Sequence, residues 1–529
     1  MRFNAQATSA IALTVLLSTH LIAAEWKQIN NPPSNPGTMV LLTNGDVMTL
    51  ASNSQVWMRL SPDAQGDYSS GSWRFTAPMS TRRLYFASNV VRDTRLIVIG
   101  GEYSGIGLQQ NWTRTAEAYD PATDSWQAIA PHPDPLFGDD PSMLLDGDRI
   151  LAGSLTTRNT WIYHYLTDTW EQNPIPKFYN DRSDEETFVK LPGGRVLVYD
   201  LFHSLSVPNG QFAEIFDPRE NRWLPASPSD STAAGFIPQL TSVSLGFEVG
   251  GALLTPLRIK HRSGAEEVFY IGATGHTAIY NPANNEWRAG PDIVGDAHFV
   301  TGLFGADDAP VAELPNGNII FAADAGPTKG LFAAPTRLFI FEPESNTISQ
   351  MFTPFDDHLN TIPAFVTRLV VLPTGQILYG DGGSNQMWVF TADGRAPGAL
   401  RPKVDDVVHG PAGSNFYRVI GRELNGASSG SGYGDDVESD ENYPIVSLTA
   451  EDGAVFYTTT SNWSNSDVGK KGAQTVDFTV PTGVTAGEYE YRLVVSGAGI
   501  RSKPFCIRFT DERVSIACQE EREKDDGND

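Results

Sequence analysis

Two stretches of the chain place adjacent carboxylates just before an apolar run, and such pairs are candidates for chemistry. In "LFGDDPSMLLDGDRILAGS" the pair is Asp139 and Asp140, and in "LFGADDAPVAELPNGNIIFAADAG" it is Asp307 and Asp308. Carboxylates at the start of a buried strand are costly to bury without a cation, a proton or a ligand. Together with arginines they suit sugar hydroxyls, a cationic substrate, acid/base catalysis or a hard metal ion such as Ca2+.

The elements that must position these carboxylates form a repeated hairpin. Two apolar runs flank a tight turn in "MVLLTNGDVMTL", "FVKLPGGRVLVYD", "RLVVLPTGQILYGDGG" and further copies, which gives seven hairpins, one of them degenerate. Asn-Gly, Asp-Gly and Gly-Gly between apolar runs favour turns that need positive φ. A second signature, as in "AEAYDPATDSW" and "TAIYNPANNEW", predicts a third strand, a turn and a fourth strand that opens with tryptophan. Each repeat is therefore a four-stranded meander, the unit of a β-propeller blade.

The "IGG" that ends at Gly101 and the Tyr-Asp-Pro-x(4)-Trp spacing resemble kelch repeats, over about residues 25–400. The last repeat has no fourth-strand tryptophan, whereas "EWKQINNPP" near the start of the chain supplies one at Trp26. We therefore expect a seven-bladed propeller whose final blade is completed by the N-terminal strand, which removes exposed sheet edges.

The pattern changes near Arg401, after which "AVFYTTTS", "QTVDFTVP" and "GEYEYRLVVSGAGIRSKPFCIRF" alternate as half-buried strands. This segment resembles the immunoglobulin-like domain that follows the kelch propeller in galactose oxidase and glyoxal oxidase. The fold class predicted is all-β, a seven-bladed kelch β-propeller followed by an immunoglobulin-like β-sandwich. The predicted domains are a signal peptide at 1–24, the propeller at 25–400, the sandwich at 401–510 and an acidic tail at 511–529.

The ends of the chain and its charge predict an exported protein. "MRFNAQATSAIALTVLLSTHLIAAEW" has Arg2, a short apolar region and small residues at a cleavage point, which are typical of a secretory signal peptide. No later segment is a transmembrane candidate, so we expect a secreted, extracellular protein. Sequons at Asn111 and Asn462 fit glycosylation, and Cys506 and Cys518 fit a disulfide. A net charge of -25 argues against nucleic acid as a partner.

The meander order assigns each loop to one of two faces. The tight turns lie on the bottom face, while the segments before each first strand and the links between second and third strands share the top face. The channel mouth on this top face should therefore collect carboxylates, arginines, tyrosines and two histidines. These candidate ligand-binding residues are Arg83, Tyr85, Tyr103, Asp139, Asp140, Arg182, Asp184, Glu186, His203, His276, Asp307, Asp308 and Arg368.

A structural interpretation competes with this functional one. Polar residues solvate loop ends, and arginines neutralise neighbouring carboxylates as ion pairs without further chemistry. The histidines have the same alternative, since hydrogen-bonded or exposed roles explain them and no His-x-His or His-Glu-x-x-His spacing is present. Asp296 and His298 could offer two metal ligands, but no third ligand is fixed by spacing.

Resemblance to galactose oxidase implies a copper site with two histidines and two tyrosines, one of them linked to a propeller cysteine. The predicted propeller has no cysteine, and no adjacent histidine pair occurs near its end. A copper-radical cofactor cannot form there in its usual way. No cofactor is assigned from the sequence, and Ca2+ is the metal that the acidic pairs would suit.

The leading hypothesis is a secreted propeller that binds a carbohydrate or another polyhydroxylated small molecule in an acidic, arginine-containing top-face pocket. Tyr103 and Trp112 could stack on sugar faces, although packing roles explain them equally. The first alternative is a copper-free acid/base enzyme, such as a lyase, isomerase or cyclase, or a diverged galactose oxidase-like oxidoreductase. Its candidate catalytic residues are Tyr85, Arg182, Asp184, Glu185 and Glu186. The second alternative is a scaffold that binds a protein partner through propeller loops.

Overall fold

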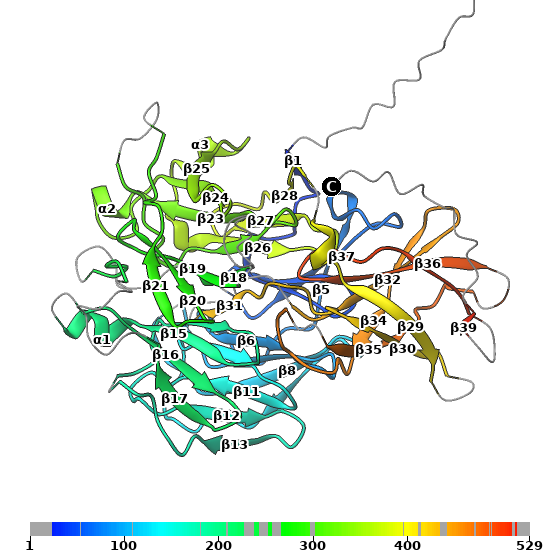
Figure 1. Ribbon diagram of the computed structural model, residues 1–529, viewed down its shortest axis with the longest axis horizontal. Helices are drawn as coiled ribbons and strands as arrows, with labels where there is room; N and C mark the ends of the chain where they lie inside the picture. The colour runs from blue at the N-terminus through cyan, green and yellow to red at the C-terminus, as the bar shows by residue number, and fades with distance from the viewer. Residues whose placement is uncertain are drawn as a thin grey trace, which may run out of the picture.

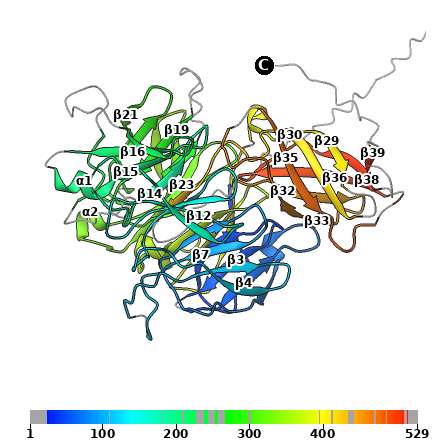
Figure 2. The same ribbon diagram turned by 90° about the horizontal axis from the view of Figure 1, so that it is seen from below.

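The computed structural model shows a β-propeller beside a smaller β-sandwich (Figures 1 and 2). In Figure 1 the propeller lies to the left and the sandwich, formed by the C-terminal part of the chain, to the right. The structure describes residues 24–52, 54–107, 109–179, 181–207, 210–226, 237–242, 252–255, 266–296, 302–394, 396–410, 414–433, 442–469, 472–485, 487, 489–509 and 514–515. The predicted signal peptide and acidic tail lie largely outside these residues.

The first four blades are antiparallel meanders in chain order. Blade 1 comprises β2 (Pro36–Leu41), β3 (Val47–Ala51), β4 (Trp57–Ser61) and β5 (Ser72–Phe75), and blade 2 comprises β6 (Ala87–Val90), β7 (Leu96–Ile99), β8 (Ala116–Asp120) and β9 (Ser125–Ile129). Blade 3 comprises β10 (Ser142–Leu144), β11 (Arg149–Ala152), β12 (Trp161–His164) and β13 (Thr169–Gln172), and blade 4 comprises β14 (Thr187–Lys190), β15 (Val196–Asp200), β16 (Phe212–Asp217) and β17 (Arg222–Pro225).

The remaining blades close the ring. Blade 5 comprises β18 (Ala252–Thr255), β19 (Glu267–Ile271), β20 (Thr277–Asn281) and β21 (Glu286–Ala289), and blade 6 comprises β22 (Val311–Glu313), β23 (Ile319–Asp324), β24 (Thr336–Glu342) and β25 (Thr347–Met351). Blade 7 comprises β26 (Thr367–Val371), β27 (Ile377–Asp381), β28 (Trp388–Thr391) and the N-terminal β1 (Glu25–Gln28). Trp26 pairs with Phe390, so the predicted closure by the N-terminal strand is confirmed.

Short helices interrupt the links between strands. They are α1 (Leu201–Ser206), α2 (Gly326–Lys329) and α3 (Asp356–Leu359), with 3-10 turns at Tyr68–Ser70, Ala364–Val366 and Gly398–Leu400. Among the described residues no helix is both long and apolar enough to cross a bilayer.

The kelch spacing has a direct physical role between blades. Tyr119 donates its hydroxyl to Asp124 Oδ1 at 2.8 Å, and Asp124 also accepts the backbone N–H of Ala77 at 3.1 Å. Trp126 Nε1 donates to the Ala77 carbonyl at 2.9 Å. The outer turn of blade 2 is therefore hydrogen-bonded to the segment that leaves blade 1. Tyr163, Asp168 and Trp170 form the same arrangement in blade 3.

The sandwich has two sheets. One contains β29 (Lys403–His409), β30 (Phe416–Arg422), β35 (Ala473–Thr479) and β34 (Thr459–Ser461). The other contains β33 (Val455–Tyr457), β32 (Ile445–Ala450), β36 (Glu490–Gly497), β38 (Phe505–Phe509) and β39 (Val514–Ser515), with β37 (Ile500–Arg501) beside β36.

The sandwich docks on the tight turns of the propeller. The Tyr457 ring covers Gly45, whose φ of 79° and lack of a Cβ allow this approach, since a Cβ would lie 2.6 Å from the ring. Tyr443 donates its hydroxyl to the Leu41 carbonyl, and the Ser466 N–H donates to Asp146 Oδ1 at 2.6 Å. The two domains are thus joined by hydrogen bonds on the bottom face.

One strand from the C-terminal part of the chain enters the propeller. β31 (Ser431–Tyr433) pairs with the first strand of blade 4, with Gly432 opposite Phe188, and it also lies against β6 and β10. In Figure 1 it lies among propeller strands, away from the sandwich. A Cβ on Gly432 would lie 2.0 Å from the Ser142 carbonyl oxygen, so glycine is required there. β31 therefore occupies the central channel.

Candidate functional site: the channel mouth of blades 2 to 4

Four non-glycine residues at the entrance to first strands have left-handed backbones. Tyr85, Asp139, Glu185 and Asp308 have φ values of 53°, 54°, 60° and 53°. Each lies six residues before an apolar residue whose backbone N–H donates a hydrogen bond across the tight turn of the same hairpin. These apolar residues are Val91, Leu145, Leu191 and Leu314. Such backbones are unfavourable for L-residues and persist where surrounding structure fixes them, often at functional sites. The repeat therefore delivers the same unusual backbone to the top face in four blades.

Backbone hydrogen bonds join three of these positions around the channel. The Asp139 N–H donates to the Tyr85 carbonyl at 3.4 Å, and the Glu185 N–H donates to the Asp139 carbonyl at 2.8 Å. Blades 2, 3 and 4 are thus linked at their entrances. The corresponding segment of blade 5 lies outside the described residues, and Asp308 occupies the position in blade 6.

The two acidic pairs are not equivalent in space, although they resemble each other in sequence. One residue more follows the Leu-Phe-Gly of blade 6, so Asp308 corresponds to Asp139, and Ala309 corresponds to Asp140. Asp307 and Asp308 are buried at 2% and 7% exposure in blade 6. The pairs therefore reach the same face by a shifted register.

Aromatic and charged side chains lie beside the linked backbone, and all of them are partly exposed except Asp139, which is buried at 2% exposure. The rings of Tyr85 and Tyr103 meet edge to face with centroids 5.6 Å apart. Arg182 Nε donates to Asp184 Oδ2 at 2.7 Å, and its guanidinium lies 3.6 Å from the centre of the Phe202 ring. We call Tyr85, Tyr103, Asp139, Arg182, Asp184 and Glu185 the mouth cluster. It offers aromatic faces, carboxylate acceptors and a guanidinium donor within one loop region.

Asp140 lies beneath the mouth cluster and is fully buried. Its Oδ2 accepts the Gly138 N–H at 3.4 Å, while its Oδ1 has no hydrogen-bond partner among the described residues. Burial raises the pKa of Asp140 well above its usual range, and the negative charge of Asp184 raises it further. Burial therefore favours the protonated form of Asp140.

Glu186 turns away from the mouth into blade 4. Lys177 Nζ lies 2.5 Å from Glu186 Oε1, 3.4 Å from Asp200 Oδ2 and 3.9 Å from Glu214 Oε1, and all four side chains are fully buried. Burial raises the pKa of Glu186 to about 8, against the lowering effect of Lys177. Burial also raises the pKa of Glu214 well above its usual range. We call these residues the Lys177 cluster.

Two predicted arginines form structural contacts instead. Arg83 is fully buried, with Nη2 2.7 Å from Glu117 Oε1 and Nη1 2.9 Å from the Thr115 carbonyl. Arg368 Nη1 donates to the backbone carbonyls of Phe365 and Thr367. For these two side chains the structural interpretation describes the geometry better than a ligand-binding one.

The two histidines lie on top-face links, outside the mouth cluster. His203 is in α1 and stacks on Tyr179 with centroids 4.6 Å apart. His276 Nδ1 lies 2.7 Å from Asp292 Oδ1. Asp296 is described, whereas His298 lies outside the described residues.

Sequence reasoning missed the aspartates that end second strands. Asp324 Oδ1 accepts the Gly326 N–H at 2.8 Å and its Oδ2 accepts the Ala364 N–H at 3.0 Å. Burial raises the pKa of Asp324 to about 6. Asp200 and Asp381 accept link N–H groups in the same way. The recurring final Asp in "VYD", "AAD" and "YGD" was the available signal, and these residues shape the top links.

The modification sites are only partly described. Asn111 and Asn462 are exposed, as glycosylation would need. Cys506 in β38 is disulfide-bonded, while Cys518 lies outside the described residues. Metal sites were sought in the same part of the chain, where no three His, Cys, Asp or Glu side chains are grouped to hold an ion.

Comparisons with known proteins agree with the architecture. Residues 83–133 match the kelch motif family. A fungal alcohol oxidase of the AA5 family, solved in complex with copper, superposes with a TM-score of 0.50 at 12% sequence identity, over 92% of this chain and 100% of that one. A search among curated proteins finds no match. The chain therefore has a galactose oxidase-like, all-β fold, a seven-bladed kelch propeller followed by an immunoglobulin-like β-sandwich.

Proposed function

We propose that the protein is secreted and binds a carbohydrate, or another polyhydroxylated small molecule, at the mouth cluster. The observation that carries this proposal is the pair of backbone hydrogen bonds that hold Tyr85, Asp139 and Glu185 side by side around the channel. These bonds fix the backbone from which one tyrosine and two acidic side chains extend. A preorganised site of this kind binds with less loss of conformational freedom.

The chemistry of the cluster matches a sugar. Tyrosine rings present apolar faces that pack on sugar C–H groups, and their hydroxyls form hydrogen bonds. The partly exposed carboxylates of Asp184 and Glu185 accept hydrogen bonds from hydroxyls, whereas Arg182 donates them. Because burial favours the protonated form of Asp140, the site carries less negative charge than its composition implies. A neutral polyol is therefore favoured over a cation.

Export and metal content belong to the same proposal. The N-terminal signal-like sequence and the exposed sequons support an extracellular location. Calcium remains the ion that the carboxylates would suit. Copper is not part of the proposal, because the predicted propeller has no cysteine and no adjacent histidine pair occurs near its end, so we derive no step through it.

One observation favours a second function, acid/base catalysis at the same mouth. Burial raises the pKa of Asp140, and the negative charge of Asp184 raises it further. Neighbouring carboxyl groups with separated pKa values commonly divide the roles of acid and base. In this alternative Asp184 would act on the ligand while Asp140 positions it, since Asp140 is enclosed.

The experiment uses the secreted full-length protein on an array of neutral saccharides, followed by calorimetric titration of the best-bound saccharide. Tyr85→Ala and Glu185→Gln should each weaken binding at least tenfold, whereas the exposed sandwich variants Tyr489→Ala and Asp452→Asn should not. Absence of binding to every neutral saccharide, or binding that survives both mouth substitutions, would overturn the proposal.

Two further measurements separate the alternatives. The bound saccharide is incubated with wild type and with Asp184→Asn, and its conversion is followed by chromatography. Conversion that is lost in the variant while folding is retained would identify an enzyme. Titration in EDTA and after Ca2+ addition would show whether the carboxylates act through a cation or directly.

A further inference from the structure

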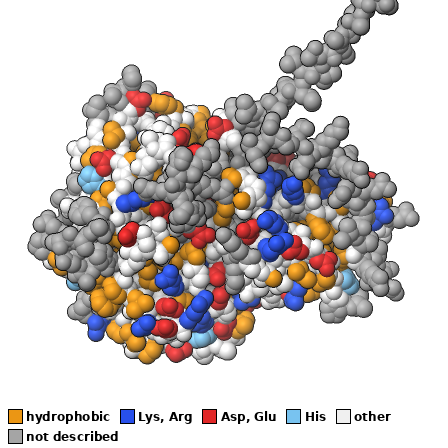
Figure 3. Space-filling view, in the orientation of Figure 1, with side chains coloured by type: hydrophobic (Ala, Val, Ile, Leu, Met, Phe, Trp, Pro, Cys, Tyr) orange, Lys and Arg blue, Asp and Glu red, His pale blue; other side chains and the backbone are white. Residues whose placement is uncertain are grey.

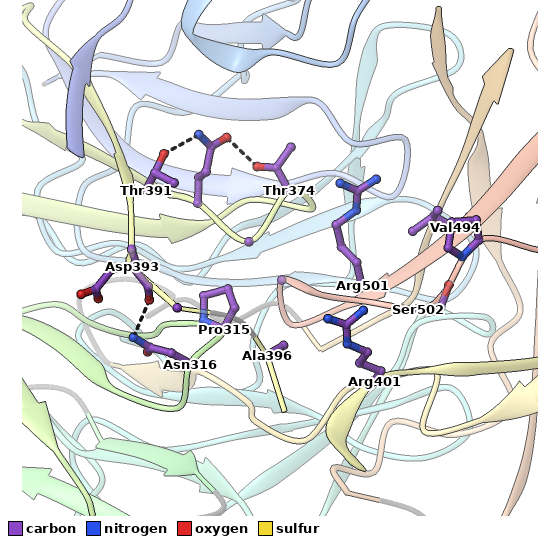
Figure 4. A pocket seen from close by; sticks show the side chains of 16 residues that line it. Pro315, Asn316, Thr374, Thr391, Asp393, Ala396, Arg401, Val494, Arg501 and Ser502 are labelled. Carbon is purple, nitrogen blue, oxygen red and sulfur yellow. Dashed lines mark hydrogen bonds between the residues drawn. The ribbon is translucent and has the colours of Figure 1, made fainter. Parts of the chain in front are cut away.

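We propose that a second site lies on the opposite face of the protein, between the propeller and the sandwich, and that it binds a small anion with two or more oxyanion charges. The structure contains a cavity of about 450 Å³ at this junction (Figure 4). Cavities of this size are typical of sites for small molecules.

The walls of the cavity come from three parts of the chain. Tight turns of blades 6 and 7 supply Asn316 and Thr374, the segment that leaves the propeller supplies Arg401, and the sandwich supplies Arg501 and Ser502. Tight turns lie on the bottom face, so this site is remote from the mouth cluster. It is formed only when the two domains are in contact.

Two glycines set the closest approach of the domains beside the cavity. Gly375 in the blade 7 turn and Gly499 in the hairpin between β36 and β37 have φ values of 83° and 72°. A Cβ on Gly375 would lie 2.9 Å from the Gly499 carbonyl oxygen, and one on Gly499 would lie 3.3 Å from the Gly375 Cα. The turn and the hairpin thus meet backbone to backbone, which fixes the position of Arg501 relative to the propeller.

Both arginines of the cavity lack an acidic partner. Neither Arg401 nor Arg501 forms a hydrogen bond or ion pair with another described residue, although most other described arginines pair with a carboxylate or a carbonyl. The phenol of Tyr457, on which the charge of Arg501 acts, does not compensate that charge, because a tyrosine with an ordinary pKa of about 10 is already neutral at neutral pH. In a chain with a net charge of -25, two unpaired guanidinium groups on one cavity form a local positive site.

The view into the cavity supports the same sign of charge. Figure 4 shows the guanidinium groups of Arg401 and Arg501 on one side and the Asp393 carboxylate directed away from them. Figure 3 shows Lys and Arg side chains gathered near the junction of the two domains. Asp393 is the only acidic residue among the lining residues, and its carboxylate does not neutralise the charges of Arg401 and Arg501.

Neutral donors complete the site. Ser502 Oγ accepts the Val495 N–H at 3.0 Å, which leaves its hydroxyl proton available for a ligand. Thr391 Oγ1 accepts from Gln376 Nε2 at 2.8 Å and keeps its proton in the same way. Guanidinium groups bind carboxylates and phosphates through paired hydrogen bonds, and hydroxyl donors add to this preference. The shared chemistry of the ligand is therefore an oxyanion, supplied by carboxylate or phosphoryl groups.

The test is calorimetric titration of the full-length protein with citrate and, separately, with inorganic phosphate at low ionic strength. Arg401→Ala and Arg501→Ala should each weaken binding at least tenfold. The control Arg492→Ala removes the same charge from an exposed position of β36 outside the cavity and should change binding less than twofold.

The outcomes are distinct. Binding of citrate alone identifies a carboxylate ligand, binding of phosphate alone identifies a phosphoryl ligand, and either result with the stated variants supports the site. Absence of binding by both probes, or an equal loss in Arg492→Ala, would overturn it. Saccharide binding at the mouth, measured in the same variants, should be unchanged, so failure of this proposal is distinguishable from failure of the proposed function.

Discussion

Replacement of Lys177 by methionine should destabilise the propeller strongly at neutral pH. The Lys177 cluster places one buried cation among the carboxyl groups of Glu186, Asp200 and Glu214, and all four side chains are fully buried. Lys177→Met keeps most of the side-chain volume and removes the charge. Breaking a buried ion pair by removing one partner costs about 3–5 kcal/mol, because the remaining charge is left uncompensated.

The raised pKa values moderate this cost. Since Glu186 and Glu214 hold protons more tightly than usual, fewer than three carboxylate charges lose their cation. We therefore expect a loss at the lower end of the range, about 3 kcal/mol at pH 7. Acidification supplies protons to the remaining carboxylates, so the loss should be smaller at pH 5 than at pH 7.

The assay is urea-induced unfolding followed by tryptophan fluorescence at both pH values. The control is Lys27→Met, because Lys27 pairs with Asp67 at 3.2 Å on the surface with its side chain 58% exposed. Exposed pairs contribute about 0–1 kcal/mol. The reasoning is refuted if Lys177→Met loses no more stability than Lys27→Met at pH 7, or if its loss is the same at pH 5.

Three other substitutions test separate parts of the structure. Burial raises the pKa of Glu186 to about 8, above its unfolded value, so protonated Glu186 stabilises the fold at acidic pH and this stabilisation is lost as the pH rises toward 8. Glu186→Gln should therefore reduce the decline in the free energy of unfolding between pH 5 and pH 8. Trp287 donates Nε1 to the Ala226 carbonyl at 2.7 Å and is 3% exposed, so Trp287→Phe should lower the free energy of unfolding by about 1–3 kcal/mol. Glu185 has a left-handed backbone, so Glu185→Gly should raise the free energy of unfolding by about 1 kcal/mol while weakening saccharide binding.

Each of these substitutions has a contradicting result, and the last two have a control variant. If the free energy of unfolding of Glu186→Gln changes with pH as much as that of the wild type, the buried carboxyl group does not exchange its proton as inferred. The control Trp73→Phe removes an indole hydrogen bond near the surface. If it lowers the free energy of unfolding as much as Trp287→Phe does, burial does not explain the loss. The control Glu451→Gly lies at an exposed position without a left-handed backbone and should be neutral or destabilising. If it raises the free energy of unfolding as much as Glu185→Gly does, relief of backbone strain does not explain the gain.

The repeat in the sequence determined the blades. Tight Gly turns and the tyrosine-to-tryptophan spacing act over a few residues, so local pattern is sufficient to predict four-stranded meanders and the face to which each loop belongs. The leading Trp26 predicted closure of the ring for the same reason, because the final repeat lacked that one residue.

Only the tertiary structure decided which charged side chains lie at the mouth. Successive residues at a strand entrance point in different directions, so Glu185 reaches the channel while Glu186 enters the Lys177 cluster. The fate of Arg83 depended on Glu117 in another strand. A sequence gives charge and approximate location, whereas burial and pairing depend on contacts between distant segments.

The longest-range features had no local signal at all. β31 reaches the first strand of blade 4 from the far end of the chain, and the cavity with Arg401 and Arg501 exists only where two domains meet. Periodicity fixes the pairing of neighbouring strands because its period matches their geometry. Contacts between domains depend on the matching of surfaces that folding brings together, so only the assembled structure revealed them.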